Sequence, residues 1–220
     1  MPTRLLDLSH DVADGVVTYR GLPAPVITDF LSREESRARY APGTEFHIGQ
    51  IEMVANTGTY LDSPFHRYPD GVDMAGLDLR VLADLPTTVV RHLQPEDRAV
   101  GAGAFAGLPL RGRAVLVHCG WARHWGQERY CEGHPFLTRE AAELLVEQGA
   151  ALLGMDTYNV DDTVDGTRPA HSLLLRAGIP IVEHLTGLER MPDEGARFFA
   201  VPVKVKGLGS FPVRAFAIVA

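Results

Sequence analysis

Two short apolar runs flank a helix-like segment in the middle of the chain, and this order constrains the fold more than any other feature. Residues 114–117 and 151–155 are almost wholly apolar, which is typical of buried strands. Residues 138–148 predict a helix, with Thr138 as its N-cap and Gly149 as its C-terminal stop. A strand, a helix and a strand in this order imply a right-handed crossover, and therefore some parallel pairing within a sheet.

Further strands are expected on either side of this unit. They comprise a short strand that ends in residues 7–10, and residues 46–54, 179–182, 198–205 and 211–219. Together these elements predict an α/β fold, rich in strands, with helices on one side of a mixed sheet. A chain of 220 residues can bury a sizeable core, so one domain over residues 1–220 is the simplest organisation.

Composition excludes several classes of function. The net charge is -7, whereas nucleic-acid binding needs a concentrated basic surface. No stretch approaches the roughly 20 apolar residues that a membrane span needs, and the first residues are too short and polar for a signal peptide. The two cysteines, Cys119 and Cys131, are expected to be reduced thiols. We therefore expect a cytoplasmic protein without nucleic-acid or membrane partners.

Residues 56–66 (Asn-Thr-Gly-Thr-Tyr-Leu-Asp-Ser-Pro-Phe-His) are the most informative window for chemistry. The run is too polar for a core strand, Pro64 removes a backbone donor, and Gly58 permits an unusual dihedral angle. Asp62 and His66 carry side chains that ligate metals and transfer protons. A surface turn held by Asp62 and threonine hydroxyls is the structural alternative.

The window resembles the signature of the cyclase family, the kynurenine formamidase-like metal-dependent hydrolases, which reads His-x-Gly-Thr-His-x-Asp-x-Pro-x-His. Gly58, Thr59, Asp62, Pro64 and His66 match it in register. Further similarity to the family extends along nearly the whole chain, at residues 7–10, 120–121, 133–135, 154–157, 171–183 and 210–214. The resemblance implies a layered α/β domain with a mixed sheet and flanking helices.

The resemblance also implies roles for particular residues. Asp62, His171 and Glu183 correspond to metal ligands, and His66 corresponds to the acid/base. The chain departs from the family at the two early signature histidines, where Asn56 and Tyr60 stand. An asparagine carbonyl is a weak zinc ligand, and a phenol must lose a proton before it binds a metal well.

Charge balance favours one divalent metal ion over two. Asp62 and Glu183 would carry two negative charges, which one divalent cation offsets; carboxylates about 4 Å apart would otherwise repel by about 4 kcal/mol at an effective dielectric constant near 20. Zinc or manganese is the expected ion, and a mixed His/carboxylate site also accepts iron. The alternative is a site without metal, in which a proton, another cation or a protonated His171 balances the charge.

Several residues are candidates for the surroundings of the site. Asn56 and Trp121 are expected at the substrate pocket, Trp121 because the Gly-Trp position of relatives lies there. Tyr60 is either a hydrogen-bond donor to a developing oxyanion or a side chain that fills space. Asp156 and Thr157 would orient a ligand histidine or brace a loop. His10 and His47 are the remaining histidines that could act as substitute ligands.

The sequence thus predicts a metal-dependent hydrolase that cleaves a C–N or C–O bond of a small amide, formamide, lactam or lactone. Arylformamidase activity on N-formylkynurenine is the family's best-known example. Two alternatives remain open: a metal-independent cyclase or dehydratase that uses His66 and Tyr60, and a non-catalytic relative that binds a small molecule. The resemblance further implies a homodimer or homotetramer.

Overall fold

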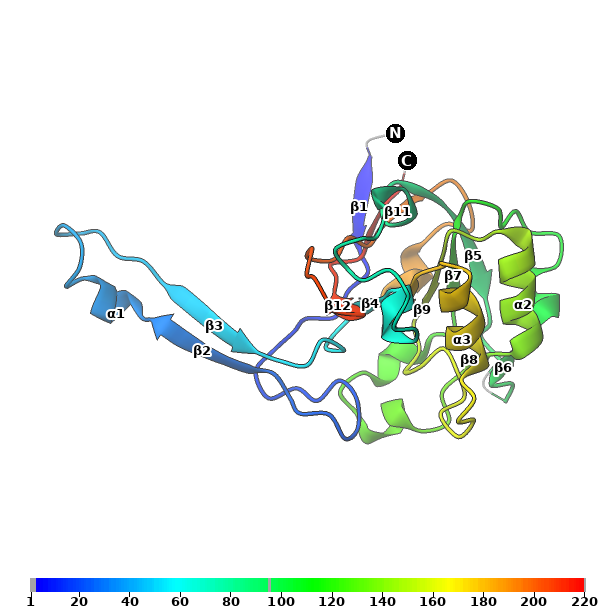
Figure 1. The fold of residues 1–220 in the computed structure, drawn as a ribbon, viewed down its shortest axis with the longest axis horizontal. Coiled ribbons are helices and arrows are strands. Elements are labelled where there is room, and N and C mark those ends of the chain that lie inside the picture. The colour runs from blue at the N-terminus through cyan, green and yellow to red at the C-terminus, as the bar shows by residue number, and fades with distance from the viewer. Residues whose placement is uncertain (1–2, 95, 220) are drawn as a thin grey trace.

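The computed structural model describes residues 3–94 and 96–219, and its centre is one nine-stranded sheet (Figure 1). The three parallel pairs lie in the middle of the sheet, and antiparallel pairs lie on both sides. In spatial order the strands are β1 (Arg4–Asp7), β13 (Phe216–Val219), β11 (Arg197–Phe199), β5 (Leu85–Arg91), β7 (Ala114–His118), β9 (Leu152–Met155), β10 (Ile181–Glu183), β4 (Tyr60–Asp62) and β12 (Ser210–Pro212). The predicted mixed sheet is confirmed.

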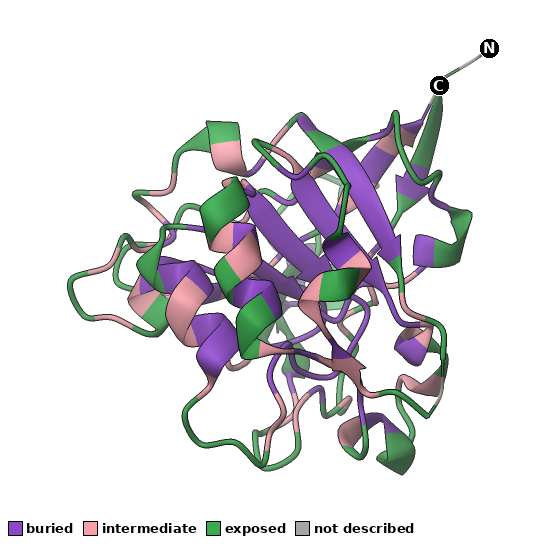
Figure 2. Cartoon of the chain, turned by 90° about the vertical axis from the view of Figure 1, so that its right-hand side faces the viewer, coloured by how far each residue is buried: buried purple, intermediate pink, exposed green. Residues whose placement is uncertain are grey.

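The helices α2 (Arg139–Gln148) and α3 (Pro169–Arg176) pack on one face of this sheet, with their buried sides toward the strands (Figure 2). Alternation along β7 serves both faces: Val115 and Val117 join the helix-side core, whereas Leu116 joins the core on the other face. The strand–helix–strand prediction is therefore confirmed, since β7, β9 and β10 are parallel neighbours.

Helix α2 forms where its local signals predict it. The Thr138 side chain accepts a hydrogen bond from the Ala141 amide at 3.2 Å, and Gly149 ends the helix with a φ of 70°. Ala142 and Leu145 bury one stripe of the helix against the sheet. Local sequence and tertiary packing agree in this element.

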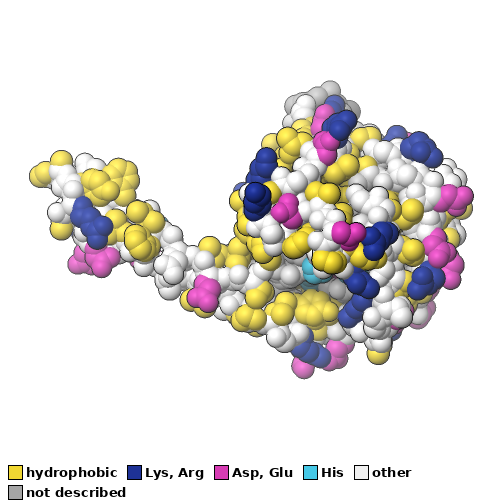
Figure 3. All heavy atoms as spheres, in the orientation of Figure 1, with side chains coloured by type: hydrophobic (Ala, Val, Ile, Leu, Met, Phe, Trp, Pro, Cys, Tyr) yellow, Lys and Arg dark blue, Asp and Glu magenta, His cyan; other side chains and the backbone are white. Residues whose placement is uncertain are grey.

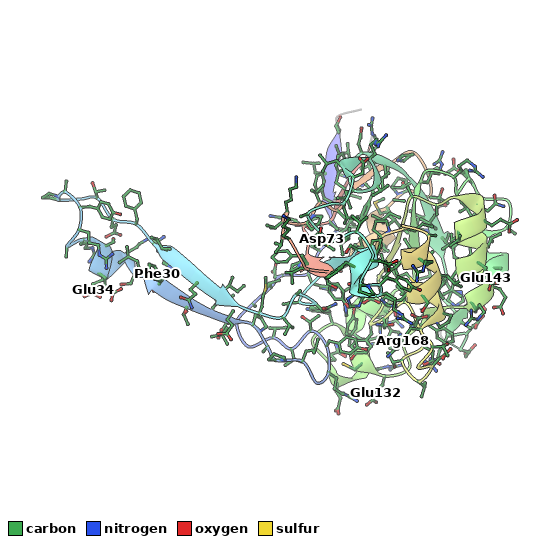
Figure 4. All side chains as sticks on the ribbon, viewed as in Figure 1. Phe30, Glu34, Asp73, Glu132, Glu143 and Arg168 are labelled. Carbon is green, nitrogen blue, oxygen red and sulfur yellow. The ribbon has the colours of Figure 1, made fainter. Side chains whose placement is uncertain are left out.

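A long hairpin projects from the body of the molecule (Figure 1). It consists of β2 (Val26–Leu31) and β3 (Ile48–Glu52), and the short helix α1 (Arg33–Ser36) follows β2. Nearly every residue of the two strands is exposed, and Phe30, labelled in Figure 4, lies well away from the sheet. The hairpin thus makes little contact with the rest of its own chain.

Two strand predictions near the C-terminus need correction. Only β11 forms within the predicted strand 198–205, and the chain leaves the sheet after Phe199. Residues 211–219 hold two strands, because β12 pairs with β4 and β13 pairs with β1 and β11, at opposite ends of the sheet. Pro212 is tolerated because β12 is an edge strand.

The remaining regular elements are short. They are β6 (Ala99–Val100), β8 (Phe136–Leu137) and the 3-10 helices η1 (Pro64–His66), η2 (Leu79–Val81), η3 (Ala102–Phe105), η4 (Trp121–His124), η5 (Glu128–Cys131) and η6 (Leu188–Arg190). None of the helices in the described ranges is both long enough and apolar enough to cross a bilayer.

Replacement of Thr138 by alanine removes the α2 cap and leaves the Ala141 amide without its side-chain acceptor. We expect Thr138→Ala to lower the free energy of unfolding by about 1 kcal/mol. Thr138→Ser keeps the hydroxyl oxygen and serves as the control. Urea denaturation measures both variants, and equal losses in the two would contradict the capping role.

Candidate active site

The pairing of β4 with β10 and β12 brings four side chains of the site together. Tyr60 lies opposite Glu183 of β10, and Asp62 lies opposite Ser210 of β12. Successive side chains of a strand alternate between faces, so Tyr60 and Asp62 point to the same side. Cross-strand neighbours on one face are in contact distance. The pairing therefore gathers two acids, a phenol and a hydroxyl at one place.

Ser210 connects Asp62 to His66 and fixes the tautomer of His66. Its hydroxyl donates to Asp62 Oδ1, because a carboxylate only accepts. The same oxygen is 3.2 Å from Nδ2 of Asn56 and 2.9 Å from Nδ1 of His66. Since the only hydroxyl proton goes to Asp62, Nδ1 of His66 must carry the proton that it shares with Ser210. Nε2 of a neutral His66 then carries the lone pair.

Tight backbone packing holds His66 near this network. His66 ends η1, and a Cβ atom added to Gly209 would lie only 2.4 Å from its backbone. Only glycine fits there, which brings the residue before Ser210 against the histidine. The side chain of His66 is 37% exposed, whereas that of Asp62 is fully buried. His66 is thus the member of the group that meets solvent and ligands.

His171 lies in the first turn of α3, and Asp161 orients its ring. One Asp161 oxygen accepts from the Ala170 amide at 2.6 Å, and the other accepts from Nδ1 of His171 at 2.7 Å. Asp161 therefore caps the first turn of α3 and holds the ring of His171. Nε2 of His171 faces Asp62 Oδ2 at 3.6 Å and Glu183 Oε1 at 3.8 Å.

Both oxygens of Glu183 have hydrogen-bond donors. The Val160 amide donates to Oε1 at 2.7 Å, and the Tyr60 hydroxyl donates to Oε2. Burial raises the pKa of Glu183 to about 7, against the opposing charge of His171. Burial and the neighbouring Glu183 also raise the pKa of Tyr60 well above its usual value. Tyr60 is therefore a neutral phenol that holds an acid, not a phenolate ligand.

The polar groups fit one divalent metal ion. Asp62 Oδ2 is buried without a hydrogen-bond partner among the described residues, and a separation of 3.6 Å from His171 Nε2 is too long for a hydrogen bond. Two ligands of one tetrahedral zinc ion lie about 3.4 Å apart. Asp62, His66 and His171 each offer a ligand atom, and these atoms lie within 4.8 Å of one another. The expected set of Asp62, His171 and Glu183 shares two of these residues, and Glu183 Oε1 also lies 3.8 Å from His171 Nε2, so either set stays a prediction.

A proton can take the same position as the metal. Burial by itself would lower the pKa of His171, but the carboxylates of Asp161 and Asp62 raise it to about 10. In the metal-free protein His171 is then a cation between two acids, while His66 and His171 together hold the pKa of Asp62 below its usual value despite burial. In either form a cation lies between the acids, as a metal ion or as the protonated imidazole of His171.

A pocket of about 300 Å³ opens above these residues. Its lining consists of Tyr19, Leu22, Asn56, Tyr60, His66, Arg67, Asn159, Arg168, His171 and Glu183. In the space-filling view a histidine is visible in a hollow of the body, beside basic side chains (Figure 3). Asn56 lies at the pocket, where the sequence places it.

The structure does not bring Trp121 to this pocket. Its side chain lies in the helix-side core, and its indole nitrogen donates to the Tyr130 carbonyl at 2.9 Å. Trp125 instead stacks on His10, with ring centroids 3.9 Å apart. The prediction that Trp121 lies at the substrate pocket needs correction, because η4 directs its ring into the helix-side core.

Other expected neighbours of the site also lie elsewhere. Asp156 accepts from the Cys119 and Gly120 amides at 2.6 and 2.8 Å, so it braces the loop after β7. Thr157 donates to the Pro135 carbonyl at 2.7 Å. Neither residue orients His171. Asp161 has that role, and the sequence analysis missed it although it lies ten residues before the histidine.

The two candidate substitute ligands lie outside the metal group. Burial lowers the pKa of His10 to about 4, and its ring packs on Trp125. His47 lies on the projecting hairpin, where Nε2 is 2.7 Å from Asp29 Oδ1. Ser210 is the other residue that the sequence analysis left without a role, although it belongs to a family-like motif.

Comparisons with known proteins show what this chain is similar to. Residues 6–162 match the family model Cyclase, described as "Putative cyclase". The chain is 28% identical over 210 residues to a kynurenine formamidase of Bacillus cereus, which covers 96% of this chain and 95% of that protein. Among solved structures, an isatin hydrolase bound to the product analogue thioisatinate superposes with a TM-score of 0.85 at 22% identity, over 99% of this chain and 92% of the other. A potential metal-dependent hydrolase with cyclase activity gives 0.80 at 22% identity, over 100% and 99%.

Substitution of single acids separates the two possible ligand sets. We expect Asp62→Asn to weaken Zn²⁺ or Mn²⁺ binding by well over 100-fold, whereas Glu183→Gln costs on the order of 10-fold, like the loss of an outer-shell partner. Isothermal titration of the metal-free protein measures both. An equal loss in the two variants would return Glu183 to the ligand set that the family resemblance implies.

Proposed function

This chain belongs to the cyclase family, and we propose that it is a metal-dependent hydrolase that cleaves the C–N bond of a small amide, in the manner of an arylformamidase. A lactam or lactone of similar size is the same chemical class of target. Kynurenine formamidase and isatin hydrolase, the relatives named above, both carry names of hydrolytic enzymes.

One observation carries the proposal. Asp62 Oδ2 and His171 Nε2 face each other at 3.6 Å without a hydrogen bond, and His66, which lines the pocket, lies beside them. Hydrolysis of an amide needs a positive centre near the carbonyl oxygen and a base near the attacking water. Asp62 and His171 offer a place for the positive centre, and His66 offers the base.

His66 is the proposed acid/base. With Nδ1 held by Ser210, Nε2 can accept a proton from a water molecule in the pocket. The oxygen of this water forms a bond to the amide carbonyl carbon, and the C–N bond then breaks. His66 returns the proton to the leaving nitrogen, so that a carboxylic acid and an amine are released and the histidine is neutral again.

Asp62 and His171 would hold the metal ion, with His66 at its edge. We propose zinc or manganese, because an imidazole suits zinc and a carboxylate suits manganese. When bound, the ion lowers the pKa of a water and polarises the carbonyl. Asp161 keeps the Nε2 lone pair of His171 directed into the site, because it accepts the proton on Nδ1.

Tyr60 and Asn56 would act on the site through hydrogen bonds. The Tyr60 proton goes to Glu183, so this phenol positions the acid. Asn56 uses one amide hydrogen for Ser210, and an amide nitrogen has two. Asn56 also lines the pocket, beside Tyr60.

Hydrolysis of N-formylkynurenine and of simple aryl formamides tests the proposal. We expect turnover that stops after chelation and returns with Zn²⁺ or Mn²⁺. His66→Gln should lower kcat by about 10²- to 10⁴-fold, because it removes the base, while the protein keeps its metal. His92→Gln, outside the pocket, is the matched control and should leave kcat unchanged.

Three other results would contradict the proposal. Turnover that is untouched by chelator would favour metal-independent chemistry by His66 and Tyr60. Tight binding of these compounds without turnover, unchanged in His66→Gln, would identify a binding protein. Loss of the metal together with activity in His66→Gln would make His66 a ligand instead of the base.

We also propose that the chain acts as a homodimer or homotetramer, with the hairpin as part of the interface. Ile27, Phe30, Phe46, Ile48 and Ile51 are 43–68% exposed on or beside its strands. A two-stranded hairpin is marginally stable alone, and a gathering of exposed apolar side chains marks an interaction surface. The cytoplasm is the proposed location, which two free thiols suit.

The double substitution Phe30→Ser and Ile48→Ser removes two of these apolar side chains. We expect it to shift the protein to monomers in sedimentation velocity without a change in the circular dichroism of the body. Thr28→Ala, on the same hairpin, should leave the oligomer intact. A wild-type monomer, or an oligomer that survives the double substitution, would place the interface elsewhere or remove it.

A further inference from the structure

Two arginines that line the pocket have no role in the mechanism above. Arg67 directly follows His66, and Arg168 directly precedes α3 (Figure 4). Together they bring two positive charges to the wall of a pocket that has one acid, Glu183, in its lining. The chain as a whole carries a net charge of -7, so this local excess of cations runs against its composition.

Neutral partners hold the side chain of Arg67. Its Nε donates to the Ser172 hydroxyl at 3.4 Å, and its guanidinium lies 5.2 Å from the centre of the Tyr68 ring. No carboxylate among the described residues lies within 4.0 Å of it. The guanidinium is exposed, and no carboxylate of the described residues pairs with its charge.

Arg168 sits in a strained backbone conformation. It has φ 47° and ψ 62°, the left-handed region that costs a residue with a side chain about 1–2 kcal/mol. Its Nη1 donates to the Asp162 carbonyl at 3.3 Å, and it too lacks a carboxylate within 4.0 Å in the described part of the chain. Asp161 caps α3 in its place, so the strain is not explained by helix capping.

Neighbouring arginines behave differently. Arg98 pairs with Asp162 at 3.4 Å, and Arg176, at the far end of α3, pairs with Asp70 at 3.4 Å. Asp162, whose carbonyl accepts from Arg168, thus gives its carboxylate to Arg98. The two arginines that line the pocket have no such pair among the described residues.

The opposite part of the lining is apolar and aromatic. Tyr19 stacks on Tyr158 with ring centroids 4.4 Å apart, and Leu22 lies beside it. A pocket of about 300 Å³ with these walls accommodates a molecule of about one aromatic ring with short substituents. Such a ligand would present one end to His66 and His171 and another to the arginines.

We propose that Arg67 and Arg168 form a subsite for a carboxylate of the substrate, which makes the preferred substrates aromatic amides or lactams that carry an acid group away from the scissile bond. A guanidinium presents donors in a fork that matches a carboxylate. The hydrolytic part of this proposal rests on the proposed function, whereas the recognition of the carboxylate does not.

Paired substrates test the subsite. Aryl formamides with a carboxylate in the ortho, meta or para position are compared with their methyl esters. We expect the wild type to favour at least one acid over its ester by 10-fold or more in kcat/KM. This ratio should fall toward 1 in Arg67→Gln and in Arg168→Gln, and Arg168→Lys should recover part of it.

Arg139→Gln, which removes an exposed positive charge of α2 that is not part of the pocket lining, is the matched control and should keep the ratio. A wild-type ratio near 1 for all three positions would overturn the subsite. A ratio that survives Arg67→Gln and Arg168→Gln, or that falls equally in Arg139→Gln, would also overturn it.

A binding measurement separates this proposal from the hydrolytic one. Isothermal titration with aminobenzoates and the corresponding aminobenzamides needs no turnover. Tighter binding of an aminobenzoate, lost in Arg67→Gln, would support the subsite even if no formamide were hydrolysed, which would refute the proposed function alone. Hydrolysis of formamides with equal binding of acids and amides would refute the subsite alone.

Discussion

One buried carboxylate oxygen, Asp62 Oδ2, sets the requirement that the rest of the site meets. It has no hydrogen-bond donor in the described structure and faces the Nε2 atom of His171. A buried charge without a partner costs several kcal/mol, and Glu183 adds a second buried acid nearby. A cation between these groups removes the penalty, either as a metal ion or as a proton on His171. The burial of Asp62 and Glu183 beside His171 therefore favours a cation at this position.

Tyr60 and Asn56 stand where the cyclase signature has histidines, and both donate hydrogen bonds to other residues of the site. Tyr60 donates to Glu183, and Asn56 donates to Ser210, which in turn binds Asp62 and His66. Through these hydrogen bonds the two side chains hold Glu183 and the group of Ser210, Asp62 and His66 in place. A neutral phenol and an amide cannot replace two imidazoles around a second ion, so the geometry favours a single ion.

Local signals in the sequence predicted local structure well. The N-cap Thr138, the helix of α2 and the apolar strands β7 and β9 each follow from a few neighbouring residues. The meeting of Asp62, His66, His171 and Glu183 came from the family resemblance, since residues more than 100 positions apart have no local signal in common. The fold that the resemblance implies is the observed one.

What the sequence could not give depends on register and on the turning of short elements. Ser210 meets Asp62 only because β12 and β4 pair in one register, across 148 positions. Asp161 reaches His171 because the chain before α3 folds back over its first turn. Trp121 followed a family-like glycine, but the burial of an aromatic ring after a turn depends on packing that the sequence does not show.

Anomalous X-ray diffraction from crystals grown with Zn²⁺ or Mn²⁺ would show whether one ion binds between Asp62 and His171. We expect one anomalous peak in each chain, about 2.0–2.2 Å from both Asp62 Oδ2 and His171 Nε2. No peak at saturating metal, or a peak bound by neither residue, would contradict this prediction.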